Sequence, residues 1–227
     1  MVLGTSAFQE FKRPRNMTKF FIILFSIFSC PYFLQAITLE RVQERYLKMQ
    51  SFQGNFQQTT IVESEARQAS ASGSIAYQRP GKMRWEYQEP DPQLLVTDGV
   101  TLWLYDPLLE NVTIQELSVV TDGTALAFLL GVGELTDDFT QRRMQKSLLS
   151  PDKSWKVLEL VPNREQSVIE FLQLGVDSES GDLEALLLKD NSGSVRIIEF
   201  EALSYNVKFS DGFFTFEVPP GMEVIRP

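Results

Sequence analysis

The stretch RPGKMRWEY (residues 79–87) combines a turn with an alternating run of side chains. Pro80-Gly81 is typical of a turn between two strands, because proline fixes its φ angle and glycine accepts a positive one. If strand alternation continues through the turn, one face carries Arg79, Gly81, Met83, Trp85 and Tyr87. An unpaired inward guanidinium is costly, so we expect Arg79 to find carbonyl acceptors at a helix C-terminus or a loop.

The flanking sequence predicts two β-hairpins. Pro80-Gly81 turns the first, and Asp98-Gly99 turns the second between residues 94–96 and 102–105. Asp106-Pro107 then ends the strand, because proline has no backbone N–H to donate to a ladder. The alternation leaves open whether Leu102 or Trp103 faces the interior.

The rest of the chain adds further strands and two helices. Thr38 can cap a first helix whose one side carries Leu39, Val42, Tyr46 and Leu47. Residues 124–131 (TALAFLLG) predict a short helix that is either buried or covers an apolar surface. Strands are expected near 52–60, 72–77, 83–87, 93–97, 102–105, 112–117, 142–147, 155–161, 169–176, 185–188, 195–200 and 213–218.

This pattern predicts a mainly β fold with helices. We expect one strongly curved antiparallel sheet of about ten strands, with the helices on its concave face. No proline-rich linker or internal repeat divides the chain. A single domain over residues 37–227 is therefore the expected organisation.

The first 36 residues have the layout of a secretory signal. Basic residues precede the apolar run FFIILFSIFS (residues 20–29), which is too short to span a bilayer, and Ala36 offers a small residue for cleavage. Met17 is a plausible start within this leader. An alternative is lipid attachment at Cys30, although Phe28 fits a lipoprotein processing box poorly.

The residue types exclude several kinds of catalysis. The chain has no histidine and a single cysteine, which rules out Ser-His-Asp and Cys-His catalysis and histidine zinc sites. A hydrolase based on two carboxylates remains a remote alternative, with Asp137-Asp138 or Glu63-Ser64-Glu65 as candidates. Such acids in polar stretches are usually solvated loop residues.

The charge is strongly acidic. Without the leader, the chain has 17 Lys and Arg against 29 Asp and Glu, a net charge of −12. This balance argues against binding to nucleic acid or to anionic lipid, since both need basic patches. It permits an encounter with a basic partner surface.

Several motifs together resemble the outer-membrane lipoprotein carrier proteins (LolA family) of the Gram-negative periplasm. They are RPGKMRWEY, TDGVTLWLYDP (97–107), FQGNFQQ (52–58) and FTFEVPPGMEV (214–224). The resemblance implies an incomplete β-barrel, lidded by helices, around an apolar cavity. It also implies a soluble periplasmic carrier that takes acylated lipoproteins from an inner-membrane ABC transporter to an outer-membrane acceptor. A monomer without cofactor or enzymatic activity is implied.

The resemblance assigns roles to particular residues. Arg79 is expected to fasten the closed lid, which the first helix and the 124–131 helix would form. The residues expected to line the cavity are Met83, Trp85 and Tyr87, together with Phe56, Leu126, Phe128 and Leu129. Alternatives within the same fold are a lipid-anchored lipoprotein acceptor and a periplasmic lipid sensor.

Overall fold

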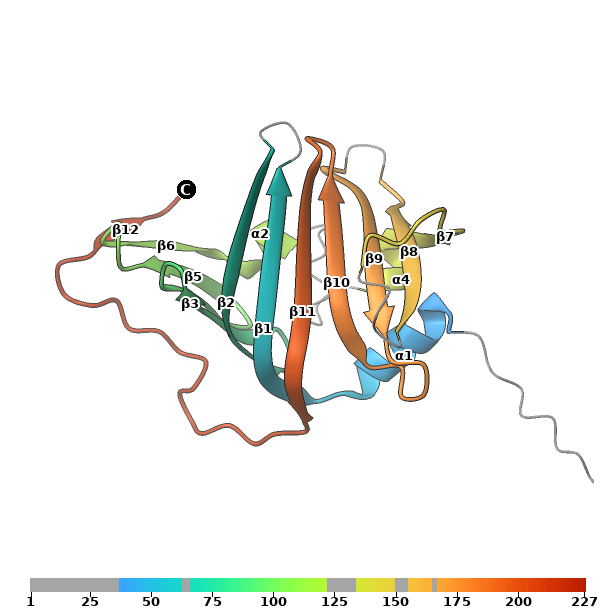
Figure 1. Cartoon of the computed structure of the whole chain (residues 1–227). Helices are drawn as coiled ribbons and strands as arrows, with labels where there is room; N and C mark the ends of the chain where they lie inside the picture. Colours follow the sequence, from blue (N-terminus) through green and yellow to red (C-terminus); the bar gives the residue numbers. More distant parts are fainter. Residues whose placement is uncertain (1–36, 63–65, 122–133, 150–154, 165–166) are drawn as a thin grey trace, which may run out of the picture. The chain divides into compact units, whose positions relative to one another are not determined.

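The computed structural model describes residues 37–62, 66–121, 134–149, 155–164 and 167–227 of the 227-residue chain (Figure 1). These residues belong to one compact unit. The leader with Met17 and Cys30, the acidic residues Glu63 and Glu65, and the 124–131 segment lie outside the described ranges. No helix within the described ranges is long and apolar enough to cross a membrane.

The described strands form one curved sheet (Figure 1). Its spatial order is β12-β6-β5-β4-β3-β2-β1-β11-β10-β9-β8-β7. Neighbours pair antiparallel except β12, which runs parallel to β6. The strand bounds are β1 Ser51–Val62, β2 Arg67–Gln78, β3 Lys82–Glu89, β4 Gln93–Asp98, β5 Thr101–Asp106, β6 Asn111–Glu116, β7 Phe139–Arg142, β8 Lys156–Pro162, β9 Ile169–Val176, β10 Leu183–Asp190, β11 Ser194–Tyr205 and β12 Glu223–Ile225. The predicted mainly β fold with one curved sheet is confirmed; the described sheet has twelve strands where about ten are expected, and its edge strand β12 is parallel.

Three helices accompany the sheet in the described ranges: α1 (Leu39–Lys48), α2 (Leu117–Thr121) and α4 (Leu135–Asp138). Thr38 caps α1 as predicted, and its hydroxyl accepts a hydrogen bond from the backbone N–H of Arg41. Leu39, Val42 and Tyr46 are buried on the expected side. Leu47 was expected there as well and is 43% exposed, while Gln43 is buried in its place. The buried stripe is therefore shifted around the helix toward α4.

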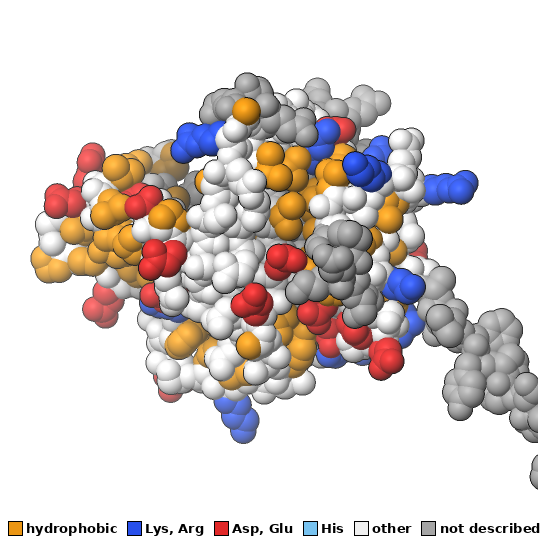
Figure 2. Space-filling view, in the orientation of Figure 1, with side chains coloured by type: hydrophobic (Ala, Val, Ile, Leu, Met, Phe, Trp, Pro, Cys, Tyr) orange, Lys and Arg blue, Asp and Glu red, His pale blue; other side chains and the backbone are white. Residues whose placement is uncertain are grey.

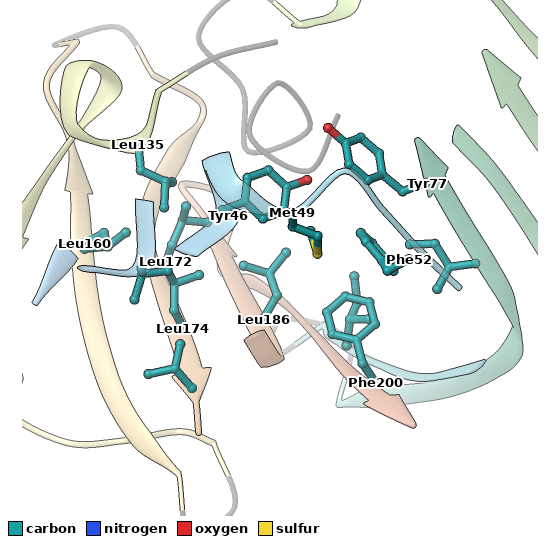
Figure 3. Close-up of a cluster of buried hydrophobic side chains, with 14 of the residues drawn as sticks. Tyr46, Met49, Phe52, Tyr77, Leu135, Leu160, Leu172, Leu174, Leu186 and Phe200 are labelled. Carbon is teal, nitrogen blue, oxygen red and sulfur yellow. The ribbon is translucent and has the colours of Figure 1, made fainter. Parts of the chain in front are cut away.

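The inner face of the sheet, defined here as the face that packs on α1, carries the main hydrophobic core. Tyr46 of α1 and Met49 just after it point toward Phe52, Tyr77 and Phe200 of the strands (Figure 3). The same cluster continues along β8, β9 and β10 through Leu160, Leu172, Leu174 and Leu186. One apolar core thus runs from the hairpin strands to the far end of the sheet.

The outer face has a second, smaller cluster that the sequence did not predict. Leu149, Phe171, Ala185, Leu187 and Val195 are buried together. Figure 2 shows this face, on which hydrophobic side chains flank a central area of uncharged polar and backbone surface over β1 and β2. Both faces of β9, β10 and β11 are therefore packed.

The strand expected near residues 142–147 is wrong over most of its length. β7 ends at Arg142, and the chain then leaves the sheet. The buried Gln173 side chain binds this departing segment, because its Oε1 accepts from Leu148 N at 2.9 Å and its Nε2 donates to Lys146 O at 3.0 Å. These bonds satisfy backbone groups that a strand ladder would otherwise satisfy.

The strand expected near residues 213–218 is also wrong. This segment has no strand partner, and a strand forms only later, at β12. Its aromatic side chains instead pack on the outer face: Phe216 lies 5.4 Å from Tyr105 between ring centroids, and the Arg84 guanidinium lies 5.8 Å from the Phe213 ring centre. The alternating aromatic residues of 213–218 therefore belong to a segment that covers the sheet and is not one of its strands.

Candidate functional site

Arg79 lies immediately after β2 and reaches the C-terminal end of α1. Its Nε donates to the Met49 carbonyl at 3.1 Å, and its Nη2 donates to the Tyr46 carbonyl at 3.1 Å. The guanidinium also lies 5.2 Å from the centre of the Tyr46 ring. The Tyr46 carbonyl also accepts from Met49 N at 3.2 Å, and the negative end of the helix dipole makes carbonyls here suitable acceptors for a cation. Arg79 therefore connects the hairpin to the end of α1.

The backbone of Arg79 strengthens the same connection. Its N–H donates to the Gln50 carbonyl at 2.9 Å, one residue beyond Met49. Side chain and backbone of one residue thus bind three carbonyls where the chain leaves α1, those of Tyr46, Met49 and Gln50. These acceptors are carbonyls at a helix C-terminus, as expected from the sequence. The role of Arg79 in fastening a lid stays a prediction.

A second arginine fastens the other side of α1. Arg45 Nε lies 2.7 Å from Asp182 Oδ1 in the turn between β9 and β10, and the Arg45 guanidinium lies 5.3 Å from the Tyr205 ring centre. Arg41 Nη2 donates to the Glu179 carbonyl of the same turn at 3.0 Å. The hydrogen bond to Asp182 raises the pKa of Arg45, against the opposing effect of burial. Sequence analysis missed this contact.

The N-terminal half of α1 is held by two glutamine side chains. Gln43 Oε1 accepts a hydrogen bond from Leu135 N of α4 at 2.8 Å, and Gln141 Oε1 of β7 accepts one from Leu39 N at 3.2 Å. α1 is thus attached by polar contacts to the hairpin, to the β9–β10 turn and to the β7 end of the sheet.

The structure brings together four of the residues predicted to line a cavity. Phe56, Met83, Trp85 and Tyr87 all belong to or pack on the inner-face core. The Phe56 ring centre lies 4.8 Å from that of Trp85 and 5.1 Å from that of Tyr87. Tyr87 donates its hydroxyl hydrogen to Gln58 Oε1 at 3.0 Å. The other predicted lining residues, Leu126, Phe128 and Leu129, lie outside the described ranges.

The pairing of β5 answers the question that the sequence left open. Leu102 is buried in the inner-face core with Met83, so it faces inward. Trp103 pairs with Val96, which pairs with the outward Arg84, so Trp103 faces outward. The inner wall of the second hairpin is therefore aliphatic.

An apolar cavity lies between α1 and strands β1, β10 and β11. Its volume is about 30 Å³, and its lining includes Val42, Tyr46, Met49, Phe52 and Phe200. This volume is about the share of one water molecule in the liquid, far less than the several hundred Å³ of a typical ligand pocket. Beneath α1 the described interior is therefore nearly filled.

The Asp137-Asp138 pair is the candidate acidic pair that falls within the described ranges. No group of three or more Cys, Asp or Glu side chains there could hold a metal ion. Asp137 is exposed, and Asp138 lies 4.0 Å from Arg164 in a surface ion pair. The pair thus ends helix α4, with Asp137 exposed and the Asp138 side chain 22% exposed.

Comparisons with known proteins agree with the motifs. Residues 47–217 match the family described as "Outer membrane lipoprotein carrier protein LolA". The chain is 31% identical over 206 residues to an outer-membrane lipoprotein carrier protein of Nitrosomonas europaea, covering 91% of this chain and 97% of that protein. It is 35% identical over 212 residues to the protein of that name from Legionella pneumophila strain Corby, covering 92% of this chain and all of the relative.

A solved structure shares the fold at low sequence identity. The crystal structure of an uncharacterized conserved protein from Thermus thermophilus superposes with a TM-score of 0.51 at 12% identity, covering 83% of this chain and 96% of that one. The family match, the extent of the carrier relatives and the curved sheet covered by α1 lead to one conclusion. This chain belongs to the outer membrane lipoprotein carrier protein LolA family.

Proposed function

We propose that the protein is a soluble periplasmic carrier of lipoproteins. It binds the acyl chains of lipoproteins released from the inner membrane and transfers them to an acceptor at the outer membrane. The observation that carries this proposal is the attachment of α1: an amphipathic helix covers an apolar sheet face and is held there by contacts that can exchange with water.

The energetics of acyl chains explain why such a protein is needed. Each methylene group moved from water into apolar surroundings contributes about 0.8 kcal/mol. A lipoprotein with long acyl chains therefore cannot cross an aqueous compartment alone. A carrier has to cover the chains and yet release them, which favours a movable cover over a rigid, deep pocket.

α1 has the properties of such a cover. Its buried side provides Val42 and Tyr46 to the cavity lining, so these side chains occupy the space that a ligand needs. When α1 moves away, an acyl chain can replace them against Phe52 and Phe200. The surface around Phe52 and Phe200 then stays covered in both states.

In this mechanism Arg79 stabilises the empty, closed state. Its bonds to the Tyr46 and Met49 carbonyls exist only while α1 lies against the hairpin. Loading has to break them, and their re-formation favours release. A lysine at this position would provide a single donor group in place of the guanidinium fork.

The partners follow from the same proposal. An inner-membrane lipoprotein-releasing ABC transporter supplies the cargo, and a lipoprotein acceptor at the outer membrane receives it. The net charge of −12 for residues 37–227 suits encounters with basic partner surfaces. Neither loading nor hand-off requires covalent chemistry, so we infer that the protein is a non-enzymatic chaperone.

The experiment is a binding assay with and without acylation. The protein purified from the periplasm is incubated with a detergent-solubilised lipoprotein or with the same protein lacking its lipid-modified cysteine, and the detergent is then removed. We expect a soluble one-to-one complex on size-exclusion chromatography with the acylated form alone. Equal behaviour of the two forms contradicts the proposal.

Mass spectrometry of the mature N-terminus separates the carrier from the acceptor alternative. A soluble carrier begins at Ile37. An acceptor of the same fold would retain an acylated Cys30, and recovery of that species would overturn the carrier assignment.

A further inference from the structure

The inner face of the hairpin contains two buried hydrogen-bond donors that have no acceptor. They are the indole Nε1–H of Trp85, a residue 6% exposed, and the hydroxyl of Tyr77, a residue with no exposed surface. Within the part of the chain that the structure describes, neither atom makes a hydrogen bond. Unsatisfied buried donors are rare in folded proteins, because each donor loses the hydrogen bond that it makes to water in the unfolded chain.

Neighbouring phenols do not satisfy these donors. Tyr46 stacks beside Tyr77 with ring centres 5.9 Å apart, and Tyr87 lies beside Trp85 at 6.3 Å. Burial raises the pKa of both Tyr77 and Tyr87; the charge of Arg79 opposes this rise at Tyr77, and the charge of Arg196 opposes it at Tyr87. Neither contact has the geometry of a hydrogen bond at the Trp85 or Tyr77 donor.

The two donors lie in adjacent rows of one wall. Tyr77 of β2 pairs with Met83 of β3, and Ile75, two residues earlier on β2, pairs with Trp85. Because side chains alternate along each strand, Tyr77, Ile75, Met83 and Trp85 share the inner face. The Tyr87 hydroxyl next along β3 donates to Gln58 Oε1, so within the described residues Tyr77 and Trp85 carry the buried hairpin donors left unpaired on this face, which we call the polar spot.

This polar spot borders the space that α1 covers. Tyr77 contacts Tyr46 and lies 5.3 Å from Phe52 between ring centres, and both of these residues line the cavity beneath α1. Trp85 lies 6.5 Å from the ring of Phe200, which lines the cavity as well. Both donor residues therefore pack directly against residues that line this cavity.

We propose that Trp85 Nε1–H and Tyr77 O–H donate hydrogen bonds to the carbonyl oxygens of bound acyl groups. This inference rests on the proposed carrier function and names the part of the ligand that the wall recognises. An acyl chain is apolar except at its ester or amide carbonyl, which needs a donor once it leaves water. Two donors on an apolar wall therefore select acyl chains over hydrocarbon chains without carbonyls.

The test compares two lipopeptides of equal chain length. One carries ester-linked palmitoyl chains on its glyceryl-cysteine, and the other carries hexadecyl chains in ether linkage and thus lacks the carbonyls. Affinities are measured on protein purified from the periplasm, by competition with a fluorescent lipid. We expect the affinity of the wild type for the ester form to be at least about tenfold higher than for the ether form, since each net hydrogen bond is worth about fivefold in affinity.

Variants assign the preference to these residues. Trp85→Phe and Tyr77→Phe each lower the ester-to-ether ratio about fivefold and leave an aromatic ring in place. Loss of packing weakens both ligands alike, so the ratio stays interpretable in a destabilised variant. Trp103→Phe is the matched control, because Trp103 faces outward on β5 and should leave the ratio unchanged.

The outcomes separate the two proposals. Equal wild-type affinity for both lipopeptides overturns the carbonyl inference and leaves the carrier function standing. An ester preference that survives in both variants overturns the assignment to Trp85 and Tyr77. Binding of neither lipopeptide overturns the carrier function and this inference with it.

Discussion

Arg45 Nε lies 2.7 Å from the Asp182 carboxylate, which fixes the last turn of α1 to the turn between β9 and β10. Arg79 holds the C-terminal end of the same helix from the hairpin. The helix therefore has arginine contacts on two sides: its own Arg41 and Arg45 bind the β9–β10 turn, and Arg79 binds the helix from the end of β2. Release of α1 requires the contacts on both sides to break, so each side makes a separate, measurable contribution.

Asp182→Asn is expected to loosen α1 with little effect on the rest of the fold. The side chains of Arg45 and Asp182 are 36% and 14% exposed, so solvent screens their attraction. We expect the free energy of unfolding to fall by about 0.5–1 kcal/mol, the upper range for partly exposed pairs. Amide hydrogen exchange in α1 should accelerate more than exchange in β9 and β10.

The control for this variant is Glu44→Gln. Glu44 pairs with Lys48 on the solvent side of α1 at 2.7 Å, with both side chains about two-thirds exposed. This pair lies within the helix and fastens nothing to the sheet. If Glu44→Gln accelerated exchange as much as Asp182→Asn, the Arg45 contact would have no special role in holding α1.

Arg79→Leu is expected to shift the protein toward the loaded state. Hydrogen bonds made by a charged group are worth about 1.5–3 kcal/mol, and the half-buried position of Arg79 favours the lower value. The empty closed state should lose about 1.5 kcal/mol, which raises affinity for an acylated peptide about tenfold. Hand-off to an acceptor should slow in proportion. Fluorescence competition and a transfer assay measure the two effects.

Two further variants test the geometry of this contact. Arg79→Lys should lie between wild type and Arg79→Leu, because an ammonium group cannot reproduce the guanidinium fork. Arg84→Leu removes an arginine of the same hairpin that faces outward, where it lies 3.6 Å from Glu86. Arg84→Leu should leave both loading and transfer unchanged. If Arg79→Leu also left both rates unchanged, Arg79 would have no part in the mechanism.

Local pattern was sufficient for the hairpins and for the kind of acceptor that Arg79 binds. Alternation over residues 79–87 determines which side chains share a face, and the pairing of β2 with β3 follows it. An arginine at the start of an apolar face needs acceptors wherever the chain supplies them. Such conclusions require only neighbouring residues, and they are confirmed where the structure tests them.

Contacts between distant segments could not be predicted in this way. Arg45 and Asp182 are 137 positions apart, and Gln43 and Leu135 are 92 positions apart. The composition of the sequence around each of these residues does not identify the residue that it contacts. The burial of Gln43 in place of Leu47 follows from α4 and could not be derived from the periodicity of α1 alone.

The C-terminal segment shows a different limit. Alternating aromatic residues suit a paired strand and also suit a chain that lies across a sheet and inserts side chains into its surface. The sequence around Phe214 satisfies both patterns. Only the position of the segment over the outward Arg84 and Tyr105 distinguishes them.

Alkaline pH is expected to destabilise the fold through Tyr205. Burial raises the pKa of this phenol, and the nearby carboxylates of Asp182 and Glu184 raise it further. The folded state therefore retains the proton more strongly than the unfolded state, whose phenols ionise near pH ~10. The stabilisation is complete below about pH 10 and is lost as the pH rises above it. Urea unfolding at about pH 8 and about pH 11 measures the loss of unfolding free energy on either side of the unfolded pKa. The loss should be smaller in Tyr205→Phe. An identical loss in that variant would exclude Tyr205 as its source.

Phe214→Ala is expected to uncover the outer face of the hairpin strands. Phe214 is buried, and the C-terminal segment around it contacts Arg84 and Tyr105, beside the fully buried Val96 and Val112. Removing a buried phenylalanine ring destabilises proteins by about 3–5 kcal/mol. We expect a loss near the lower value, because the segment lies at the surface and can relax, measured as the free energy of unfolding in urea.

Phe213→Ala is the matched control: its ring is only half-buried, so the loss should be about 1 kcal/mol. Equal losses in the two variants, or none, would mean that the segment does not cover the sheet in solution, and binding of a hydrophobic dye to Phe214→Ala alone should report the newly exposed valines.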